Sequence, residues 1–266
     1  MPPDTIWRRS KTALVTGATA GIGLEIARAL ALEGAIVIIT GRDRAKLDAA
    51  IATVKASGDK AVSGILADAA SAEGASLIAK AAPAIDILVN NLGIYESKQF
   101  GDITDADWNH LFDINVMSGV RLSRAYLPGM LERSWGRIIF ISSESGLAVP
   151  ADMIHYATTK TAQLSISRGL AQLTRGTNVT VNAVMPGPTR SDGIETFLRS
   201  QAGDPSAPIK QIEAEFFATA RSSSILQRMV EAEEVASLVA YLASPRSSAT
   251  NGAALRAEGG LINTIA

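Results

Sequence analysis

The chain has 266 residues, a length that suits one domain with a sizeable core, and its charge is nearly balanced. Lys and Arg total 25 against 26 Asp and Glu, so the formal net charge is -1. This leaves no positive surplus for a phosphate backbone or an anionic lipid surface, and we expect neither nucleic-acid nor membrane binding. The absence of cysteine excludes disulfides, thiolate metal sites and a cysteine nucleophile.

The N-terminal residues 1–11 contain two prolines and the basic residues Arg8, Arg9 and Lys11, without the apolar stretch of a secretory signal. The longest apolar runs, such as Ala35–Ile39, have the length of a strand. They are far shorter than the roughly 20 residues that cross a bilayer. We therefore expect a cytoplasmic protein.

Strand-like and helix-like segments alternate along the chain. In order, the pattern predicts strand Ala13–Val15, helix Gly21–Leu32, strand Ala35–Ile39, helix Arg42–Ser57, strand Ala61–Leu66, helix Ser71–Ala82, strand Ile85–Val89, helix Asp105–Arg133, strand Arg137–Ile141, helix Ile154–Thr174, strand Val179–Val184, helix Ala232–Ala243 and strand Ala253–Arg256. Pro128 is expected to kink or break the long helix. The alternation predicts an α/β fold: a single Rossmann-type domain over residues 1–266, with a doubly wound parallel sheet and helices on both faces.

Residues 193–226 interrupt this alternation. The segment contains Gly203, Pro205 and Pro208, followed by the amphipathic stretch Ile209–Ala220. An insertion of this length after the C-terminal end of a strand is typical of a functional loop. We expect it to form a lid over a ligand site.

A glycine-rich turn, residues 16–23, joins the first strand to the first helix. Gly17, Gly21 and Gly23 permit a tight turn and close backbone approach, and the helix N-terminus presents free N–H groups to a pyrophosphate. The alternative is a turn that needs glycine for packing alone. The position of the glycine-rich turn directly after the first strand favours a dinucleotide site.

The end of the second strand bears on which dinucleotide fits. The sequence there is Thr40-Gly41-Arg42, with no carboxylate before Asp43 to bond a ribose 2′-hydroxyl. Arg42 is suited to a 2′-phosphate, although a solvated arginine at a helix start is the alternative. The pattern favours NADP(H), with NAD(H) as the other candidate.

Tyr156 and Lys160 lie four residues apart on one predicted helix, so their side chains are neighbours. The pKa of a free tyrosine is near 10, and a nearby cation is needed to make the phenol a general base at neutral pH. Ser142 and Ser143 end the fifth strand, at the sheet edge where ligands of open α/β folds bind. Together with the glycine turn, these residues predict a catalytic site.

These motifs resemble those of the short-chain dehydrogenase/reductase family, over roughly residues 11–192 and 227–260. In chain order they are Thr16–Gly23, Asp68, Asn90–Gly93, Asn115, Ser143, Tyr156 with Lys160, and Pro186 with Gly187. Ser143 precedes Tyr156 by 13 residues, as in many family members, which selects the second serine of the pair. The departures from the family pattern are Leu92 for alanine, Ser191 for threonine, Glu258 for aspartate and Asn251 for threonine.

The resemblance implies a role for each motif residue. Tyr156 would be the acid/base, Ser143 would bond the reacting oxygen, Lys160 would lower the tyrosine pKa and hold the nicotinamide ribose, and Asn115 would position a relay water. The implied cofactor-binding residues are Gly17, Ala20, Gly21, Ile22, Gly23, Arg42, Asp68, Asn91, Gly93, Tyr156, Lys160, Pro186, Gly187 and Thr189. The family also implies a homodimer or homotetramer.

Several other residues are weaker candidates. His155 and His110 are interpreted as structural or surface residues, and no His–carboxylate cluster has the spacing of a metal site. Glu144 either contacts a polar substrate group or is a solvated loop carboxylate. The expected pocket walls are mostly apolar: Tyr95, Leu147, Met153, Met185, Ile194, Phe197, Leu198, Phe216 and Phe217. Arg190, Arg199, Lys210 and Arg221 could steer an anionic substrate or be solvated.

The function that these observations predict is hydride transfer between nicotinamide and a ketone, a 3-oxoacyl thioester or a secondary alcohol. A dinucleotide-responsive binding protein of the same fold is the alternative, and the intact Ser143, Tyr156 and Lys160 argue against it. An enoyl reductase or a sugar-nucleotide epimerase would show different motif spacing. The sequence does not identify the substrate.

Overall fold

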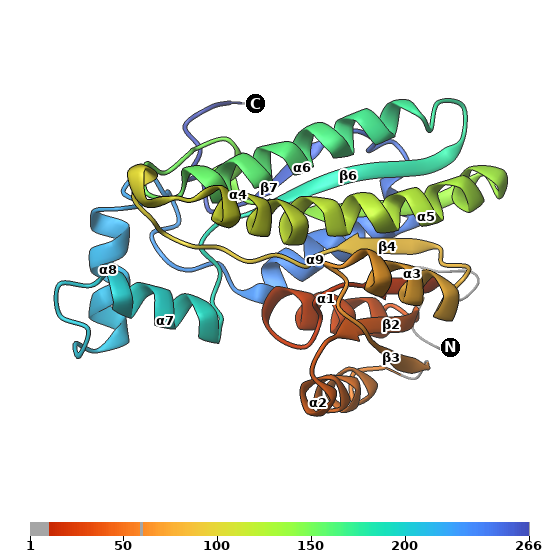
Figure 1. Cartoon of the computed structure of the whole chain (residues 1–266), viewed down its shortest axis with the longest axis horizontal. Helices are drawn as coiled ribbons and strands as arrows, with labels where there is room; N and C mark the ends of the chain where they lie inside the picture. Colours follow the sequence, from red (N-terminus) through yellow and green to blue (C-terminus); the bar gives the residue numbers. More distant parts are fainter. Residues whose placement is uncertain (1–10, 59–60, 266) are drawn as a thin grey trace.

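The computed structural model describes residues 11–58 and 61–265, so Arg8 and Arg9 of the N-terminal basic cluster lie outside the described residues. Its centre is a seven-stranded sheet in the order β3-β2-β1-β4-β5-β6-β7 (Figure 1). The strands are β1 Thr12–Val15, β2 Ile36–Gly41, β3 Val62–Leu66, β4 Ile87–Asn90, β5 Trp135–Ile141, β6 Asn178–Pro186 and β7 Ala254–Ala257. All neighbouring pairs are parallel, which confirms the predicted fold class.

The order in which the chain adds strands to the sheet reverses at β1. Leu14 of β1 pairs with Ile38 of β2 on one side and with Leu88 of β4 on the other, because β2 and β3 are laid down outward before the chain crosses back to β4. In open α/β sheets ligands bind outside the carboxyl ends of the strands at such a reversal. The fold therefore places the candidate site at the ends of β1 and β4.

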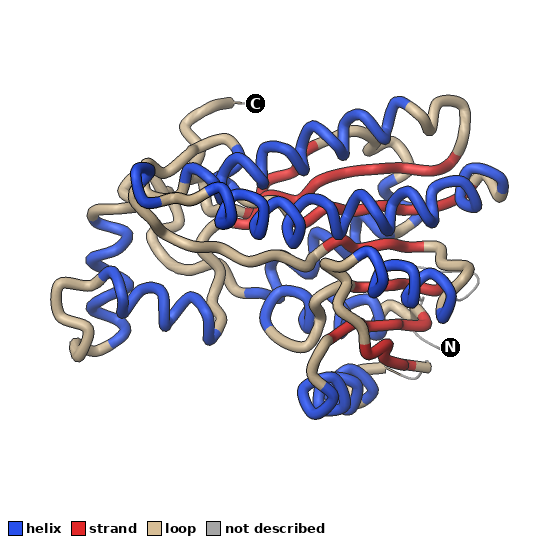
Figure 2. The backbone as a smooth tube through the Cα atoms, viewed as in Figure 1, coloured by secondary structure: helices blue, strands red, loops and turns tan. Residues whose placement is uncertain are grey.

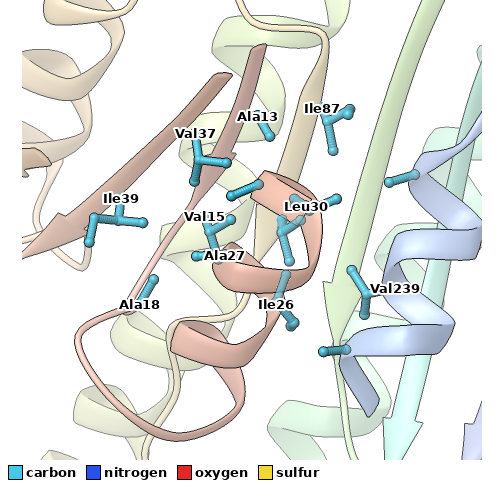
Figure 3. Packing of buried hydrophobic residues seen from close by; sticks show 14 of the residues in the cluster. Ala13, Val15, Ala18, Ile26, Ala27, Leu30, Val37, Ile39, Ile87 and Val239 are labelled. Carbon is cyan, nitrogen blue, oxygen red and sulfur yellow. The ribbon is translucent and has the colours of Figure 1, made fainter. Parts of the chain in front are cut away.

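Helices cover both faces of the sheet, as Figure 2 shows. The α-helices are α1 Gly21–Leu32, α2 Arg44–Lys55, α3 Ala72–Ala81, α4 Asp105–Phe112, α5 Ser118–Glu132, α6 Ile154–Gln172, α7 Asp192–Gln201, α8 Ile209–Ala218 and α9 Ala232–Ala243. On one face α1, α2 and α9 pack against the sheet, with Ile26 and Leu30 of α1 near Val15 and Val37 (Figure 3). On the other face α3, α5 and α6 pack against the opposite sides of the same strands. Burial on both faces explains the unbroken apolar runs in β1, β2 and β4.

The long helix predicted over residues 105–133 is interrupted, but at a different place from the one expected. The segment Asp113–Met117 forms a π-helical turn between α4 and α5, and α5 continues through Pro128 to Glu132. Pro128 was expected to kink or break the helix, and the expected break is therefore wrong. The flanking residues Leu127 and Met130 are buried in the core, and this packing holds the helix together although proline contributes no N–H group.

Two helices after β6 lie beyond the end of the sheet and form a small unit of their own (Figure 1). The amphipathic stretch predicted at residues 209–220 corresponds to α8, whereas α7 was not predicted. Ser191 begins α7 by accepting a hydrogen bond from the Ile194 N–H at 3.2 Å, a local capping signal present in the sequence. Leu198, Ile212 and Phe217 form a separate apolar cluster with Ala207 and Met229.

Within the described residues, no helix combines the length and the apolar character that crossing a membrane requires.

Candidate active site

A cavity of about 290 Å³ opens where the carboxyl ends of β1, β4, β5 and β6 meet. Of the residues expected in the site, thirteen line it together: Gly17, Ala20, Gly21, Ile22, Gly23, Asn91, Gly93, Ser143, Tyr156, Lys160, Pro186, Gly187 and Thr189. The expected site residues Asn115, Arg42 and Asp68 lie outside its lining. The fold thus brings the glycine turn and the Ser–Tyr–Lys group to one hollow, although they are far apart in the sequence.

The glycine turn leaves the start of α1 open. Gly17 and Gly21 have φ angles of +61° and +56°, which favour glycine, and Ala20 at the N-cap offers no side-chain oxygen to the first N–H groups of the helix. At Gly23 a methyl group would lie 2.7 Å from the Gly17 carbonyl oxygen and still nearer to the Asn91 amide. The turn therefore presents unclaimed backbone donors, an arrangement that fits a pyrophosphate.

Asn91 fastens this turn to the loop after β4. Its Nδ2 donates to the carbonyl oxygens of Thr16 and Gly17 at 2.9 and 3.1 Å. The Thr16 hydroxyl in turn accepts from the N–H groups of Asn91 and Leu92, both at 3.0 Å. Leu92 fits beneath the turn, with its Cα 3.1 Å from where a Gly17 Cβ would stand. The side chain of Asn91 thus positions the turn.

At the end of β2 an arginine and a carboxylate have different surroundings. Arg42 is exposed, and the next residue, Asp43, caps α2 by accepting from the Lys46 N–H at 2.9 Å. The later arginine, Arg44, is paired with Asp48 at 3.0 Å. Asp68 is exposed beyond β3 and accepts from the Ala70 N–H at 3.0 Å. The first carboxylate after β2 is therefore already used as a helix cap.

Ser143, Tyr156 and Lys160 occupy the inner wall of the cavity. Ser143 follows β5, and the other two residues lie on the first turns of α6, where Lys160 Nζ is 5.6 Å from the centre of the Tyr156 ring. The Lys160 ammonium donates to the Ile141 carbonyl at 3.0 Å. Glycine at position 93 leaves room here, since a Cβ would lie 3.3 Å from Lys160 Nζ.

Burial sets the protonation of these groups. It raises the pKa of Tyr156 well above its usual value of 10, and the Glu144 carboxylate raises it further, so the phenol keeps its proton at neutral pH. Burial lowers the pKa of Lys160 to about 8, which still leaves the amine mostly charged at pH 7. The site therefore contains a protonated phenol, the form that can donate a proton, beside a cation.

Asn115 lies in the π-helical turn, behind the cavity wall. Its side chain accepts from the Ile94 N–H at 2.8 Å and donates to the Ile94 carbonyl at 2.9 Å and to the Thr159 hydroxyl at 2.9 Å. Its main-chain carbonyl accepts from Gln163 Nε2 at 2.5 Å. Asn115 thus ties the loop after β4 to α6. Gln163 is a partner that no sequence motif indicated.

Glu144 is buried beside Ser143, with 5% of its surface exposed. The Ser143 hydroxyl donates to its carboxylate, and the Ser145 hydroxyl donates to it at 3.1 Å. Arg221, from the chain after α8, lies 3.7 Å from the same carboxylate. The interpretation of Glu144 as a solvated loop residue is therefore wrong, and a buried ion pair stands in the cavity wall.

The two histidines lie apart from this chemistry. His155 is buried outside the cavity lining, with Nε2 3.3 Å from the Glu96 carboxylate and its ring edge-on to Trp108. His110 is exposed on α4. In the part of the chain that the structure describes, no group of three or more histidine and acidic side chains is arranged to hold a metal ion.

The helices α7 and α8 supply part of the cavity wall. Of the expected wall residues, Tyr95, Met153, Ile194, Phe197 and Phe216 line the cavity. The others do not line it: Leu147 is half exposed, Met185 is buried in β6, and Leu198 and Phe217 belong to the apolar cluster of the two helices. Arg190 pairs with Glu213 and Glu231, and Arg199 pairs with Glu195. These arginines are thus neutralised within the chain.

Comparisons with known proteins place the chain in a family. Residues 11–201 match the family model described as short chain dehydrogenase. "Uncharacterized oxidoreductase YvaG" of Bacillus subtilis is 50% identical, covering 97% of this chain and 98% of that protein. The D-beta-hydroxybutyrate dehydrogenase of Cupriavidus necator is 33% identical, covering 95% and 98%. The structure of L-sorbose reductase from Gluconobacter frateurii, in complex with NADPH and L-sorbose, has a TM-score of 0.91 at 28% identity and covers 98% of this chain and 100% of that one. The chain belongs to the short-chain dehydrogenase/reductase family of oxidoreductases.

Proposed function

We propose that this protein is an NADP(H)-preferring oxidoreductase that interconverts a ketone and a secondary alcohol, with Tyr156 as the proton donor and acceptor. One observation carries the proposal: Ser143, Tyr156 and Lys160 line the same cavity as the open N-terminus of α1. When bound, the nicotinamide supplies or accepts the hydride. The residues of the chain hold the substrate and move the proton.

In the direction of reduction, the Tyr156 phenol donates its proton to the carbonyl oxygen, and the Ser143 hydroxyl donates a hydrogen bond to the same oxygen. Donation leaves a tyrosinate, which the Lys160 cation, 5.6 Å from the ring centre, stabilises. In the reverse direction this tyrosinate takes the proton of the alcohol. Asn115 positions these groups by tying the loop after β4 to α6.

The preference for NADP(H) rests on the end of β2. Arg42 is exposed there, and the Asp43 carboxylate is engaged as the cap of α2. A guanidinium suits a 2′-phosphate, whereas a free carboxylate would suit a 2′-hydroxyl. The residues of the glycine turn would hold the pyrophosphate, Asp68 the adenine, Asn91 and Gly93 the ribose region, and residues 186–189 the carboxamide. The similar L-sorbose reductase was solved with NADPH.

The proposed lid is the segment 193–226. Its residues Ile194, Phe197 and Phe216 reach the cavity, where Phe197 packs edge-on against Tyr95 with ring centres 5.8 Å apart. Tyr95 in turn packs edge-on against Tyr156 at 6.2 Å. This chain of rings connects the lid to the acid/base residue, so movement of α7 would change access to the phenol.

The test is an assay of NADPH and NADH oxidation by the purified protein with a panel of ketones and a 3-oxoacyl thioester. We expect turnover with at least one ketone and a higher kcat/KM with NADPH than with NADH. Binding of NADPH without oxidation by any carbonyl, and without reduction of NADP by the corresponding alcohols, would contradict the proposal. That result would favour a dinucleotide-responsive binding protein. Light scattering on the same sample tests the homodimer or homotetramer expected from the family.

A further inference from the structure

We infer that Glu144 and Arg221 form a subsite for a hydroxyl group on the carbon next to the reacting carbonyl. The substrate class is then the α-hydroxy ketones and the matching diols, not acyl thioesters or carboxylates. This inference rests on the proposed function, because it assumes that the reacting carbonyl lies between Ser143 and Tyr156.

The Glu144–Arg221 ion pair lies in the wall of the cavity in which the substrate would bind. Both side chains line the cavity together with Ser143 and Tyr156, and both are largely buried. Arg221 is held in position because its Nη1 donates to the Ala220 carbonyl at 2.9 Å and its guanidinium lies 5.5 Å from the centre of the Phe216 ring. A buried carboxylate and guanidinium at 3.7 Å are close enough for a single hydroxyl to join them. The hydroxyl would donate to Glu144 and accept from Arg221.

The hydrogen bond from Ser143 to Glu144 connects this subsite to the chemistry. A serine hydroxyl has one proton, so Ser143 cannot donate to a substrate carbonyl oxygen while it donates to Glu144. Ser143 donates to Oε2 of Glu144, whereas Arg221 faces Oε1, so a substrate hydroxyl bound between Glu144 and Arg221 does not displace Ser143. It competes with Ser143 for the same negative charge, which weakens the Ser143–Glu144 bond and frees the serine proton for the carbonyl oxygen. A ketone without that hydroxyl must break the Ser143–Glu144 bond with no replacement. The geometry therefore favours α-hydroxy ketones in turnover as well as in binding.

The charges around the cavity also favour an uncharged, hydroxylated substrate. A carboxylate or phosphate next to the reacting carbon would meet the Glu144 carboxylate together with Arg221, whose positive charge Glu144 already balances, so the pair offers no net attraction to an anion. The lid arginines Arg190 and Arg199 are paired with their own glutamates. A second space of about 180 Å³ shares Met153, Phe197, Phe216 and Arg221 with the cavity, and Asp152 and Glu215 are among the residues that line it. Further hydroxyl groups of a longer substrate would find acceptors there.

The experiment compares two ketones of nearly the same shape, 1-hydroxy-2-butanone and 3-pentanone, with saturating NADPH. In the wild-type protein we expect kcat/KM to favour the hydroxy ketone by roughly tenfold or more, because a site built to bond a hydroxyl discriminates against the analogue without it. In Glu144→Gln we expect this preference to fall by about tenfold, since the charged acceptor is lost. Glu195→Gln is the matched control: Glu195 is an exposed lid carboxylate outside the cavity, paired with Arg199, so the preference should persist.

Arg221→Gln provides a second variant if Glu144→Gln does not fold, and the same loss of preference is expected. The inference is overturned if the wild-type protein reduces both ketones equally well, or if the preference survives in the folded variants. Neither of these two results contradicts the proposed function, because both require that the wild-type protein reduces a ketone. If the wild-type protein oxidises neither NADPH nor NADH with any ketone, the proposed function itself is contradicted and the inference is overturned with it.

Discussion

The two halves of the sheet meet at one cavity but offer different kinds of groups to it. In the first half, β1 and α1 present backbone N–H groups from a glycine turn whose N-cap residue, Ala20, makes no side-chain bond. In the second half, β5 and α6 present side chains, of which Glu144 and Lys160 are almost completely buried. The first half suits the close approach of a polyphosphate, whereas the second half places a protonated phenol beside a cation in the wall of the cavity.

This difference predicts opposite sensitivities. A backbone site fails when atoms are added, because close approach is lost. A side-chain site fails when a single functional atom is removed, even if the shape of the site is unchanged. We therefore expect changes in the first half to weaken dinucleotide affinity and changes in the second half to reduce turnover.

The largest effect is expected from Tyr156→Phe, which removes only the phenolic oxygen. Turnover should fall by roughly 10²- to 10⁴-fold, the contribution of general acid catalysis, while NADPH affinity stays nearly unchanged. Steady-state rates and a fluorescence titration on the same sample measure both quantities. Tyr126→Phe is the control, because Tyr126 is buried under α3, away from the cavity, and its loss of a hydroxyl should leave turnover intact. Rapid turnover by Tyr156→Phe would refute the proposed mechanism.

Next in size is Arg42→Ala, which tests the charge at the end of β2. Loss of a charge-assisted bond to a 2′-phosphate should weaken NADPH binding by about 1.5–3 kcal/mol and barely affect NADH. Parallel titrations with the two dinucleotides give the comparison. Arg44→Ala controls for the loss of a positive charge two residues further on, at the start of α2, since Arg44 is already paired with Asp48. Equal losses for NADPH and NADH would remove Arg42 as the residue that discriminates.

Gly23→Ala adds one methyl group to the glycine turn. The added Cβ would press on the Gly17 carbonyl and the Asn91 amide and displace the turn. Overpacking costs about 1–3 kcal/mol of folding stability, and we expect dinucleotide affinity to fall by a similar amount because the displaced N–H groups no longer match the pyrophosphate. The control is Gly169→Ala in α6, where the structure leaves open space around the new Cβ. If Gly23→Ala binds NADPH as well as Gly169→Ala does, the turn does not hold the pyrophosphate.

The smallest effect is expected from Asp43→Ala, which removes the cap of α2. The free energy of unfolding should fall by about 1 kcal/mol, because the Lys46 N–H loses its acceptor. The ratio of NADPH to NADH affinity should change little, since the carboxylate is engaged in the cap. Denaturant unfolding and the two titrations measure these results. A large shift of the ratio toward NADPH would show that Asp43 contacts the ribose instead.

The sequence predicted those parts of the molecule that depend on short-range spacing. The strand and helix alternation, the glycine turn and the Tyr156–Lys160 spacing are all local patterns, and the structure places the last two at one cavity. The helix α7 was missed because glycine and proline in that segment obscured the Ser191 capping signal. The break at Pro128 was wrong because buried neighbours outweigh the missing N–H group.

The burial of Glu144 could not be predicted, because its partner Arg221 lies far along the chain and contacts it only through the tertiary fold. The bond from Gln163 to the Asn115 carbonyl is equally dependent on the fold. Residue type and local spacing identify a candidate acid or base. The charges and acceptors that surround it are set by contacts between distant segments.

The central claim is that one half of the sheet binds the dinucleotide and the other transfers the proton. The most direct test is to measure NADPH affinity and the single-turnover oxidation of NADPH by a ketone substrate, side by side, in Gly23→Ala and Tyr156→Phe. We expect opposite defects. Gly23→Ala should bind weakly but oxidise bound NADPH at close to the wild-type rate, and Tyr156→Phe should bind normally but oxidise it very slowly. If both variants lose affinity and rate together, or if Tyr156→Phe keeps the wild-type rate, the division of binding and proton transfer between the two halves is contradicted.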